Sequence, residues 1–168
     1  MFRCRLRDLG LRGFVRLALA GAAVAAAAGC AGAIPSSQGG AATVMLRSAD
    51  PGRFLVDEQG HTLYLFAADE DGESYCHGAC ASIWPPYETD GTPQAGAGVD
   101  SGKLSTVEGG DGDRQVAYDG HPLYYYAGDA SEPGETYGEG LKQFGAEWYL
   151  VGPDGKAVEE EREGEGAR

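Results

Sequence analysis

Short apolar runs alternate with turn-forming residues through the middle of this 168-residue chain. Runs of four or five residues rich in Val, Leu, Phe and Tyr are typical of β-strands, and Asp-Gly between two such runs is a strong hairpin signal. Residues 43–47 form one predicted strand, and three hairpins follow. The first hairpin joins strands 53–56 and 62–66 through a turn at 57–60. The second joins 115–118 and 122–126 through 119–121. The third joins 147–151 and 156–158 through 152–155.

Successive side chains of a strand point to opposite faces of a sheet. Tyr64 and Phe66 therefore share one face, and Leu63 and Leu65 share the other. Both faces are apolar, so we expect this strand to be covered on both sides. The fold class expected is all-β, built mainly of antiparallel hairpins.

One segment departs from the strand pattern. Residues 77–84 are expected to form a short helical turn, which Pro85 and Pro86 end because proline lacks the backbone donor and disfavours helix in the residue before it. Residues 88–112 are rich in Gly, Asp, Ser and Thr, and we expect a long loop there, around Lys103 and Leu104.

An internal repeat organises the predicted strands. Residues 56–69 align without gaps on residues 116–129, at an offset of 60, with seven of fourteen positions identical. Similar fragments follow, Glu73-Ser-Tyr75 and Glu135-Thr-Tyr137. The repetition predicts two pseudo-symmetric units that form one small domain over residues 43–158, with repeat 1 at about 50–87 and repeat 2 at about 112–152.

The first 29 residues have a different character. Five arginines precede an uncharged run of 13 residues at 17–29, which is the pattern of a secretory signal peptide and is shorter than the roughly 20 residues of a bilayer span. Ala27-Ala-Gly29 before Cys30 resembles the bacterial lipobox. We expect cleavage before Cys30 and lipidation of its thiol, with ordinary secretion as the alternative. Residues 30–42 would then be a lipidated N-terminus and flexible tether, and 159–168 a disordered charged tail.

The net charge of the mature chain limits the classes of molecule that it can bind. Removal of residues 1–29 takes away five arginines and Asp8, which leaves 8 Lys and Arg against 25 Asp and Glu, a net charge of −17. Such a surface repels nucleic acid, so no nucleic-acid role is expected. The expected partner is the membrane, reached through the lipid anchor, and the expected location is extracytoplasmic: the outer face of the plasma membrane or the periplasm.

Cys76 and Cys80 are the cysteines that remain after Cys30 takes up lipid. In an oxidising compartment two cysteines four residues apart in a helical turn are expected to form a disulfide. The alternative is a thiolate site for copper or zinc, with His77, His61 or His121 as the third ligand. His61 and His121 follow Gly at equivalent turn positions, and each is expected to hydrogen-bond within its own turn.

Several motifs together resemble those of bacterial secreted-repeat lipoproteins. The pattern Tyr-x-(Phe/Trp/Tyr)-x-x-Asp occurs twice, and two further fragments support it. The matching residues are Tyr64, Phe66 and Asp69; Tyr124, Tyr126 and Asp129; Cys76-x-x-x-Cys80-Ala81 with Trp84-Pro-Pro86; and Phe144-Gly-x-x-Trp148. The resemblance covers most of residues 50–152. It implies no mechanism, because the biochemical role of that family is largely unassigned.

The recurring motif admits two interpretations. The aromatic residues can be core, with Asp69 and Asp129 ending each strand in an Asx-type turn. Alternatively, Tyr64 and Tyr124 line a pocket with an Asp nearby. Signatures such as Gly-x-Ser-x-Gly and the phosphate-binding loop are absent from the sequence. The function expected is a binding or structural envelope module without a cofactor, and the alternative is a metal-binding or redox protein.

Overall fold

The computed structural model describes residues 40–110, 112–129 and 132–158, and these residues are all-β. Two short 3₁₀ turns, η1 (Ser101–Lys103) and η2 (Ala127–Asp129), are the helical elements in this part of the chain. None of its helices is long and apolar enough to cross a membrane. The strands are β1 (Thr43–Ala49), β2 (Gly52–Val56), β3 (Tyr64–Phe66), β4 (Gln94–Ala95), β5 (Leu104–Glu108), β6 (Arg114–Tyr118), β7 (His121–Pro122), β8 (Lys142–Gln143) and β9 (Ala146–Leu150).

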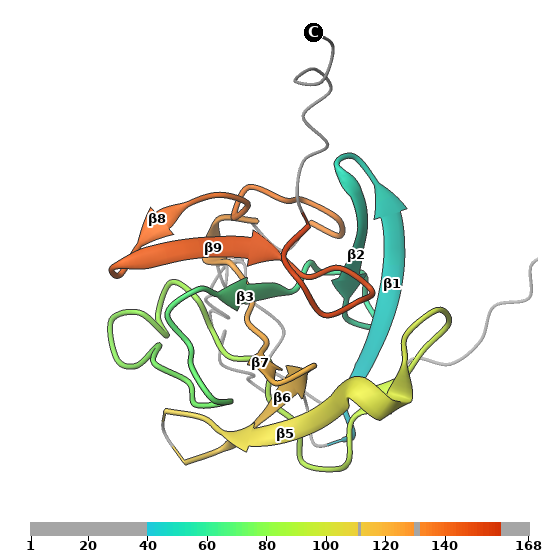
Figure 1. Ribbon diagram of the computed structural model, residues 1–168, viewed down its shortest axis with the longest axis horizontal. Coiled ribbons are helices and arrows are strands. Elements are labelled where there is room, and N and C mark those ends of the chain that lie inside the picture. The colour runs from blue at the N-terminus through green and yellow to red at the C-terminus, as the bar shows by residue number, and fades with distance from the viewer. Residues whose placement is uncertain (1–39, 111, 130–131, 159–168) are drawn as a thin grey trace, which may run out of the picture. The chain divides into compact units, whose positions relative to one another are not determined.

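Three small sheets hold these strands, in the orders β2-β1-β4, β3-β9-β8 and β5-β6-β7 (Figure 1). The pairs are antiparallel except β1 with β4. The Asp-Gly signal is confirmed, because Asp119 and Gly120 have φ of 51° and 86° and join β6 to β7 by a two-residue turn. Positive φ at both central residues is the type I′ geometry, which matches the twist of paired strands.

The first predicted hairpin is only partly formed. Val56 and Thr62 make an isolated bridge across the 57–60 turn, whereas β2 pairs along its length with β1. The third hairpin is present as a bridge between Val151 and Ala157. One prediction about a loop is corrected, because residues 88–112 contain β4, η1 and β5. An unpredicted hairpin joins β8 to β9 through Phe144 and Gly145.

Residues 77–84 form consecutive turns that include the short helical turn predicted there. Two backbone bonds have α-helical spacing, from the N–H of Ser82 to the carbonyl of Gly78 at 3.2 Å and from Trp84 to Cys80 at 2.8 Å. Pro85 follows directly, so the segment does not extend beyond a single helical turn.

The two repeats exchange strands. In the first repeat Tyr64 of β3 pairs with Leu150 of β9, which lies near the end of the second repeat. In the second repeat Tyr124 forms a bridge with Pro86, which lies at the end of the first. We call residues 63–66 and 123–126 the central segments of the two repeats. Each central segment is completed by the C-terminal segment of the other repeat, and the two repeats form one unit.

The structure corrects the gapless alignment of the two repeats. In the strand that precedes the turn, equivalent residues are shifted by one position. Leu63 and Leu123 donate their backbone N–H to the carbonyls of Leu55 and Val116, at 3.0 and 2.9 Å. Leu55 is thus the equivalent of Val116, whereas the alignment pairs Val56 with Val116. The turn of the first repeat is one residue longer, which shifts the register of the strand before it.

Two cores lie on opposite faces of the central segments, as the alternation predicts. The aliphatic core takes Leu63 and Leu65, and the aromatic core takes Tyr64 and Phe66. The aliphatic core consists of Ala42, Val44, Leu55, Leu63, Leu65, Tyr87, Val116, Tyr118, Leu123, Tyr125 and Val151. The aromatic core consists of Phe54, Val56, Tyr64, Phe66, Cys76, Cys80, Trp84, Tyr124, Trp148 and Leu150.

Candidate functional site

The motif tyrosines and aspartates pair reciprocally between the repeats. The hydroxyl of Tyr64 donates to Asp129 Oδ2 at 2.7 Å, and that of Tyr124 donates to Asp69 Oδ2 at 2.8 Å. Tyr64 and Tyr124 also exchange backbone N–H···O bonds of 2.9 and 3.0 Å. A pseudo-two-fold axis therefore passes between these two tyrosines, and each repeat supplies the carboxylate that its partner repeat needs.

The second oxygen of each carboxylate closes a loop. Asp69 Oδ1 accepts from the N–H of Tyr75 at 2.8 Å, and Asp129 Oδ1 accepts from the N–H of Tyr137 at 3.0 Å. The predicted Asx-type turn is thus replaced by a longer closure of six and eight residues. The bonded backbone groups belong to the similar fragments that follow the two aligned blocks, which explains why those fragments recur.

Burial shapes the proton affinities of these groups. Burial raises the pKa of Asp69 to about 6, and the hydrogen bonds from Tyr75 and Tyr124 offset part of that effect. Burial likewise raises the pKa of Asp129 to about 6. The pKa values of Tyr64 and Tyr124 are raised well above the ordinary value, by burial first and then by the neighbouring carboxylate. At neutral pH each pair is therefore a neutral phenol donating to an ionised carboxylate.

Four aromatic rings stack in the aromatic core. Trp84 and Trp148 lie face to face, with ring centroids 3.8 Å apart and planes 5° apart. Tyr126 stacks on the outer face of Trp84 at 4.3 Å, and Phe66 stacks on Trp148 at 4.2 Å. Gln143 accepts a hydrogen bond from each indole N–H. Its side-chain Oε1 accepts from Trp84 at 2.9 Å, and its backbone carbonyl accepts from Trp148 at 3.3 Å. The stack follows the same pseudo-symmetry, because Phe66 and Tyr126 are equivalent motif positions.

The disulfide predicted between Cys76 and Cys80 is present, with Cα atoms 5.2 Å apart, and both cysteines are buried in the aromatic core. His77 is exposed beside it. His61 bonds within its own turn, as predicted, whereas His121 pairs by its backbone with Tyr118. Within the described ranges no three His, Cys, Asp or Glu side chains gather as metal ligands, so the structure does not support the copper or zinc alternative.

The sequence profile of a family described as "secreted repeat of unknown function" matches residues 45–88 and 105–152. The chain belongs to this family of secreted repeats. The two matched segments begin within β1 and within β5. No curated protein and no solved structure matches the chain. The family's description as secreted fits a module that works outside the cell.

The motif residues of the secreted repeats serve the fold rather than an exposed pocket. The side chains of Tyr64 and Tyr124 are 0% exposed, so they offer no surface to a ligand. A surface hollow of about 460 Å³ lies elsewhere, lined by Ala67, Lys142, Gly145, Ala146 and Glu147. The arrangement favours the interpretation of the aromatic residues as core.

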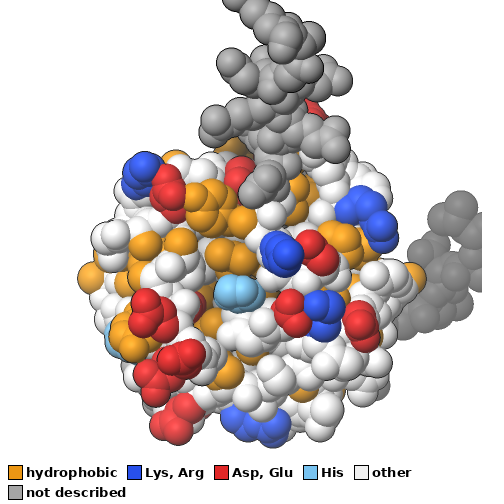
Figure 2. Space-filling view, viewed as in Figure 1, with side chains coloured by type: hydrophobic (Ala, Val, Ile, Leu, Met, Phe, Trp, Pro, Cys, Tyr) orange, Lys and Arg blue, Asp and Glu red, His pale blue; other side chains and the backbone are white. Residues whose placement is uncertain are grey.

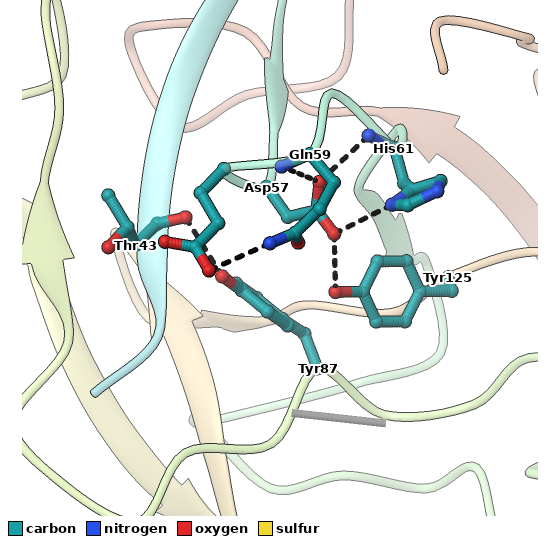
Figure 3. A network of polar contacts seen from close by, with 7 residues as sticks. Thr43, Asp57, Gln59, His61, Tyr87 and Tyr125 are labelled. Carbon is teal, nitrogen blue, oxygen red and sulfur yellow. Dashed lines mark hydrogen bonds and ion pairs between the residues drawn. The ribbon is translucent and has the colours of Figure 1, made fainter. Parts of the chain in front are cut away.

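A further carboxylate, that of Asp57, is buried and was not predicted from the sequence (Figure 3). It is 1% exposed and accepts the backbone N–H of Gln59 and His61 at 2.9 and 2.8 Å. Its other oxygen lies 2.9 Å from both His61 Nδ1 and the Tyr125 hydroxyl. An Asp–His pair can orient a general base, but within the described residues no hydroxyl or thiol bonds to the other ring nitrogen. The position of Asp57 before a turn was the available signal, but Tyr118 replaces it in the second repeat.

Proposed function

We propose that the chain is a lipid-anchored protein outside the cell, in which two secreted repeats form one non-catalytic module with a binding or structural role. The observation that carries this proposal is the reciprocal bonding of Tyr64 to Asp129 and of Tyr124 to Asp69. The residues that recur between the repeats are used to hold the repeats together, as a structural unit requires.

The sequence around Cys30 supports the anchor. A basic start, a short apolar run and small residues precede this cysteine. Diacylglycerol at Cys30, with a further acyl chain, would give stable membrane attachment, because each buried methylene contributes about 0.8 kcal/mol. The twelve residues between Cys30 and Thr43, where β1 begins, can span at most roughly 40 Å when extended, which would keep the module near the membrane surface.

Exposed aromatic side chains support a binding role. Tyr75 is 52% exposed and Tyr137 is 65% exposed, at equivalent places in the two repeats. Exposed aromatic residues are enriched at sites of protein interaction. Carboxylates flank both tyrosines, since Glu73 lies beside Tyr75 and Glu135 beside Tyr137. Acidic side chains gather along one side of the face shown in Figure 2, which would favour a partner of positive charge.

Mass spectrometry of the full chain expressed in a bacterium that processes lipoproteins tests the anchor. We expect a mature N-terminus at Cys30 carrying acyl chains, and recovery in the membrane fraction. The Cys30→Ala variant should lose the lipid, whereas the matched Cys4→Ala variant should keep it, because Cys4 leaves with the signal. Recovery of wild-type protein that begins at Met1 and lacks lipid would refute the anchor.

The binding role is tested by cross-linking on cells that carry either the wild type or the variant Tyr75→Ser with Tyr137→Ser. We expect the variant to fold normally, since both side chains are exposed, and to lose defined cross-linked products. Identical cross-linked products from both proteins would show that Tyr75 and Tyr137 do not contribute to binding. Turnover of an envelope component by the purified protein would contradict the non-catalytic role.

A further inference from the structure

The aromatic core contains a continuous series of oxidisable side chains. Tyr64 packs edge-on against Trp84 with centroids 5.4 Å apart, and Tyr124 packs edge-on against Trp148 at 5.2 Å. The two indoles are stacked at 3.8 Å. The series therefore runs Tyr64–Trp84–Trp148–Tyr124, with rings in contact at every step. It ends at both sides on a carboxylate, Asp129 or Asp69.

Two physical requirements for one-electron transfer through a protein are met here. Electron transfer between aromatic rings falls steeply with distance, so rings in van der Waals contact exchange an electron far faster than separated ones. A tyrosine is oxidised readily only when its proton has an acceptor, because the oxidised phenol is a strong acid. Asp129 Oδ2 and Asp69 Oδ2 lie within hydrogen-bond reach of the two hydroxyls, and at neutral pH both carboxylates are largely ionised.

We propose that the aromatic core carries one-electron oxidation from the protein surface to Tyr64 and Tyr124, so that the secreted repeats act as a sink for one-electron oxidants outside the cell. The inference depends only on the core and is independent of the anchor and of the binding role. It assigns a chemical use to the motif residues in addition to their structural one.

The surface end of the path is Tyr126. This side chain is half-buried and stacks on Trp84 at 4.3 Å, whereas both indoles are fully buried. Tyr126 also contacts Tyr64 edge-on, with centroids 6.4 Å apart. An oxidant at the surface therefore reaches the stack through Tyr126. Phe66 lies at the other end of the stack. It takes no part in the electron transfer, because a phenylalanine ring resists oxidation.

A one-electron oxidant, either a radical or a high-potential metal complex, takes one electron through Tyr126 and Trp84. The O–H bond of Tyr64 or Tyr124 breaks, and its proton passes to Asp129 or Asp69. The products are the reduced oxidant, a neutral tyrosyl radical and a neutral carboxylic acid. A thiol or another one-electron reductant then returns the electron, and the proton goes back to the tyrosine oxygen.

Laser flash oxidation of the full chain tests this path. Ruthenium tris(bipyridine), photo-oxidised with a quencher, is the oxidant, and transient absorption distinguishes tyrosyl from tryptophanyl radicals. The parent protein carries Tyr75→Phe, Tyr137→Phe and Tyr64→Phe, which removes two exposed tyrosines and leaves Tyr124 at the end of the path. In this parent Trp148 is the required link to Tyr124.

We expect Trp148→Phe to lower several-fold the Tyr124-dependent tyrosyl yield, which is the part of the signal that Tyr124→Phe removes from that parent. Phe66→Leu disturbs the same stack but removes no oxidisable ring, so it should leave the yield unchanged. Asp69→Asn keeps a side chain of the same shape but removes the proton acceptor, so it should also lower the yield several-fold. Equal yields with and without Trp148, or equal losses in the Phe66→Leu control, would overturn the proposal. If Trp148→Phe fails to fold, an unchanged yield in Asp69→Asn overturns it.

Discussion

The hydroxyl of Tyr64 lies 2.7 Å from Asp129 Oδ2, although the two residues are 65 positions apart in the chain. Asp129 is 7% exposed and also accepts the N–H of Tyr137. One carboxylate thus satisfies a buried phenol from the first repeat and a backbone donor from the second. Removing it would leave the Tyr64 hydroxyl without its acceptor in the core and would release the part-buried N–H of Tyr137.

Asp129→Ala is expected to lower the free energy of unfolding by about 1 to 3 kcal/mol, which is typical when a buried donor loses its partner. Urea denaturation followed by tryptophan fluorescence measures the change. Asp90→Ala is the matched control, because Asp90 is an exposed aspartate and should change stability by less than about 0.5 kcal/mol. Equal stability of the wild type and Asp129→Ala would show that the Tyr64 bond contributes nothing.

Stability should depend on pH through Asp69 and Asp129. The folded-state pKa of each is about 6, above the ordinary value of 3.8, so folding favours the protonated form. The resulting stabilisation is complete below about pH 4 and is lost as pH rises toward 6. After allowance for partial exposure, we expect on the order of 1 kcal/mol for each group.

This pH effect is measured by comparing unfolding curves of the wild type and the Asp69→Asn, Asp129→Asn double variant from pH 4 to 7. The double variant should show a flatter profile in this window. General repulsion among the many carboxylates changes both proteins alike, so the difference between them isolates the two sites. Parallel profiles would contradict the raised pKa values.

Neither repeat should fold alone, because β3 needs β9 and Tyr124 needs the segment at Pro86. We expect the separate fragments 31–99 and 100–168 to lack the near-ultraviolet circular dichroism of packed tryptophans. Mixing them should restore that signal, since Trp84 and Trp148 come from different fragments and stack only when the fragments meet. A folded single fragment would show that the strand exchange is dispensable.

Phe144→Asn should stabilise the protein. Phe144 has φ of 56° at the turn between β8 and β9, a left-handed conformation that costs a non-glycine residue roughly 1 to 2 kcal/mol and that asparagine tolerates better. The ring is 49% exposed, so little packing is lost. We expect a gain of about 1 kcal/mol and a higher Tm by calorimetry. Phe54→Asn, which alters a fully buried phenylalanine, should destabilise strongly and marks the opposite case.

Local signals predicted the features that depend on neighbouring residues. The Asp119-Gly120 turn, the opposed apolar faces at Leu63 and Tyr64, and the Cys76–Cys80 disulfide follow from sequence spacing alone. β5 was missed because its Leu-Ser-Thr-Val-Glu sequence is partly polar and lies in a stretch rich in turn formers. It forms because β6 pairs with it along five residues.

Long-range relationships could not be read from spacing. The repeat identified Tyr64, Asp69, Tyr124 and Asp129 as important, but no local pattern states that each tyrosine bonds the aspartate of the other repeat. The stack of Trp84 on Trp148 was hidden for the same reason. Its signal was a shared spacing: Trp148 lies two positions before Leu150, the partner of Tyr64, and Trp84 lies two positions before Pro86, the partner of Tyr124. This equivalence becomes visible only when the exchanged strands are known.

The strand exchange has a consequence for how such a protein could originate and grow. A polypeptide with a single copy of the unit would meet its own Tyr–Asp requirement only by associating with a second molecule, as a homodimer. Tandem gene duplication would convert that dimer into one chain of the present kind. Chains with an even number of units can close on themselves, whereas an odd number would leave one tyrosine unmatched and favour self-association.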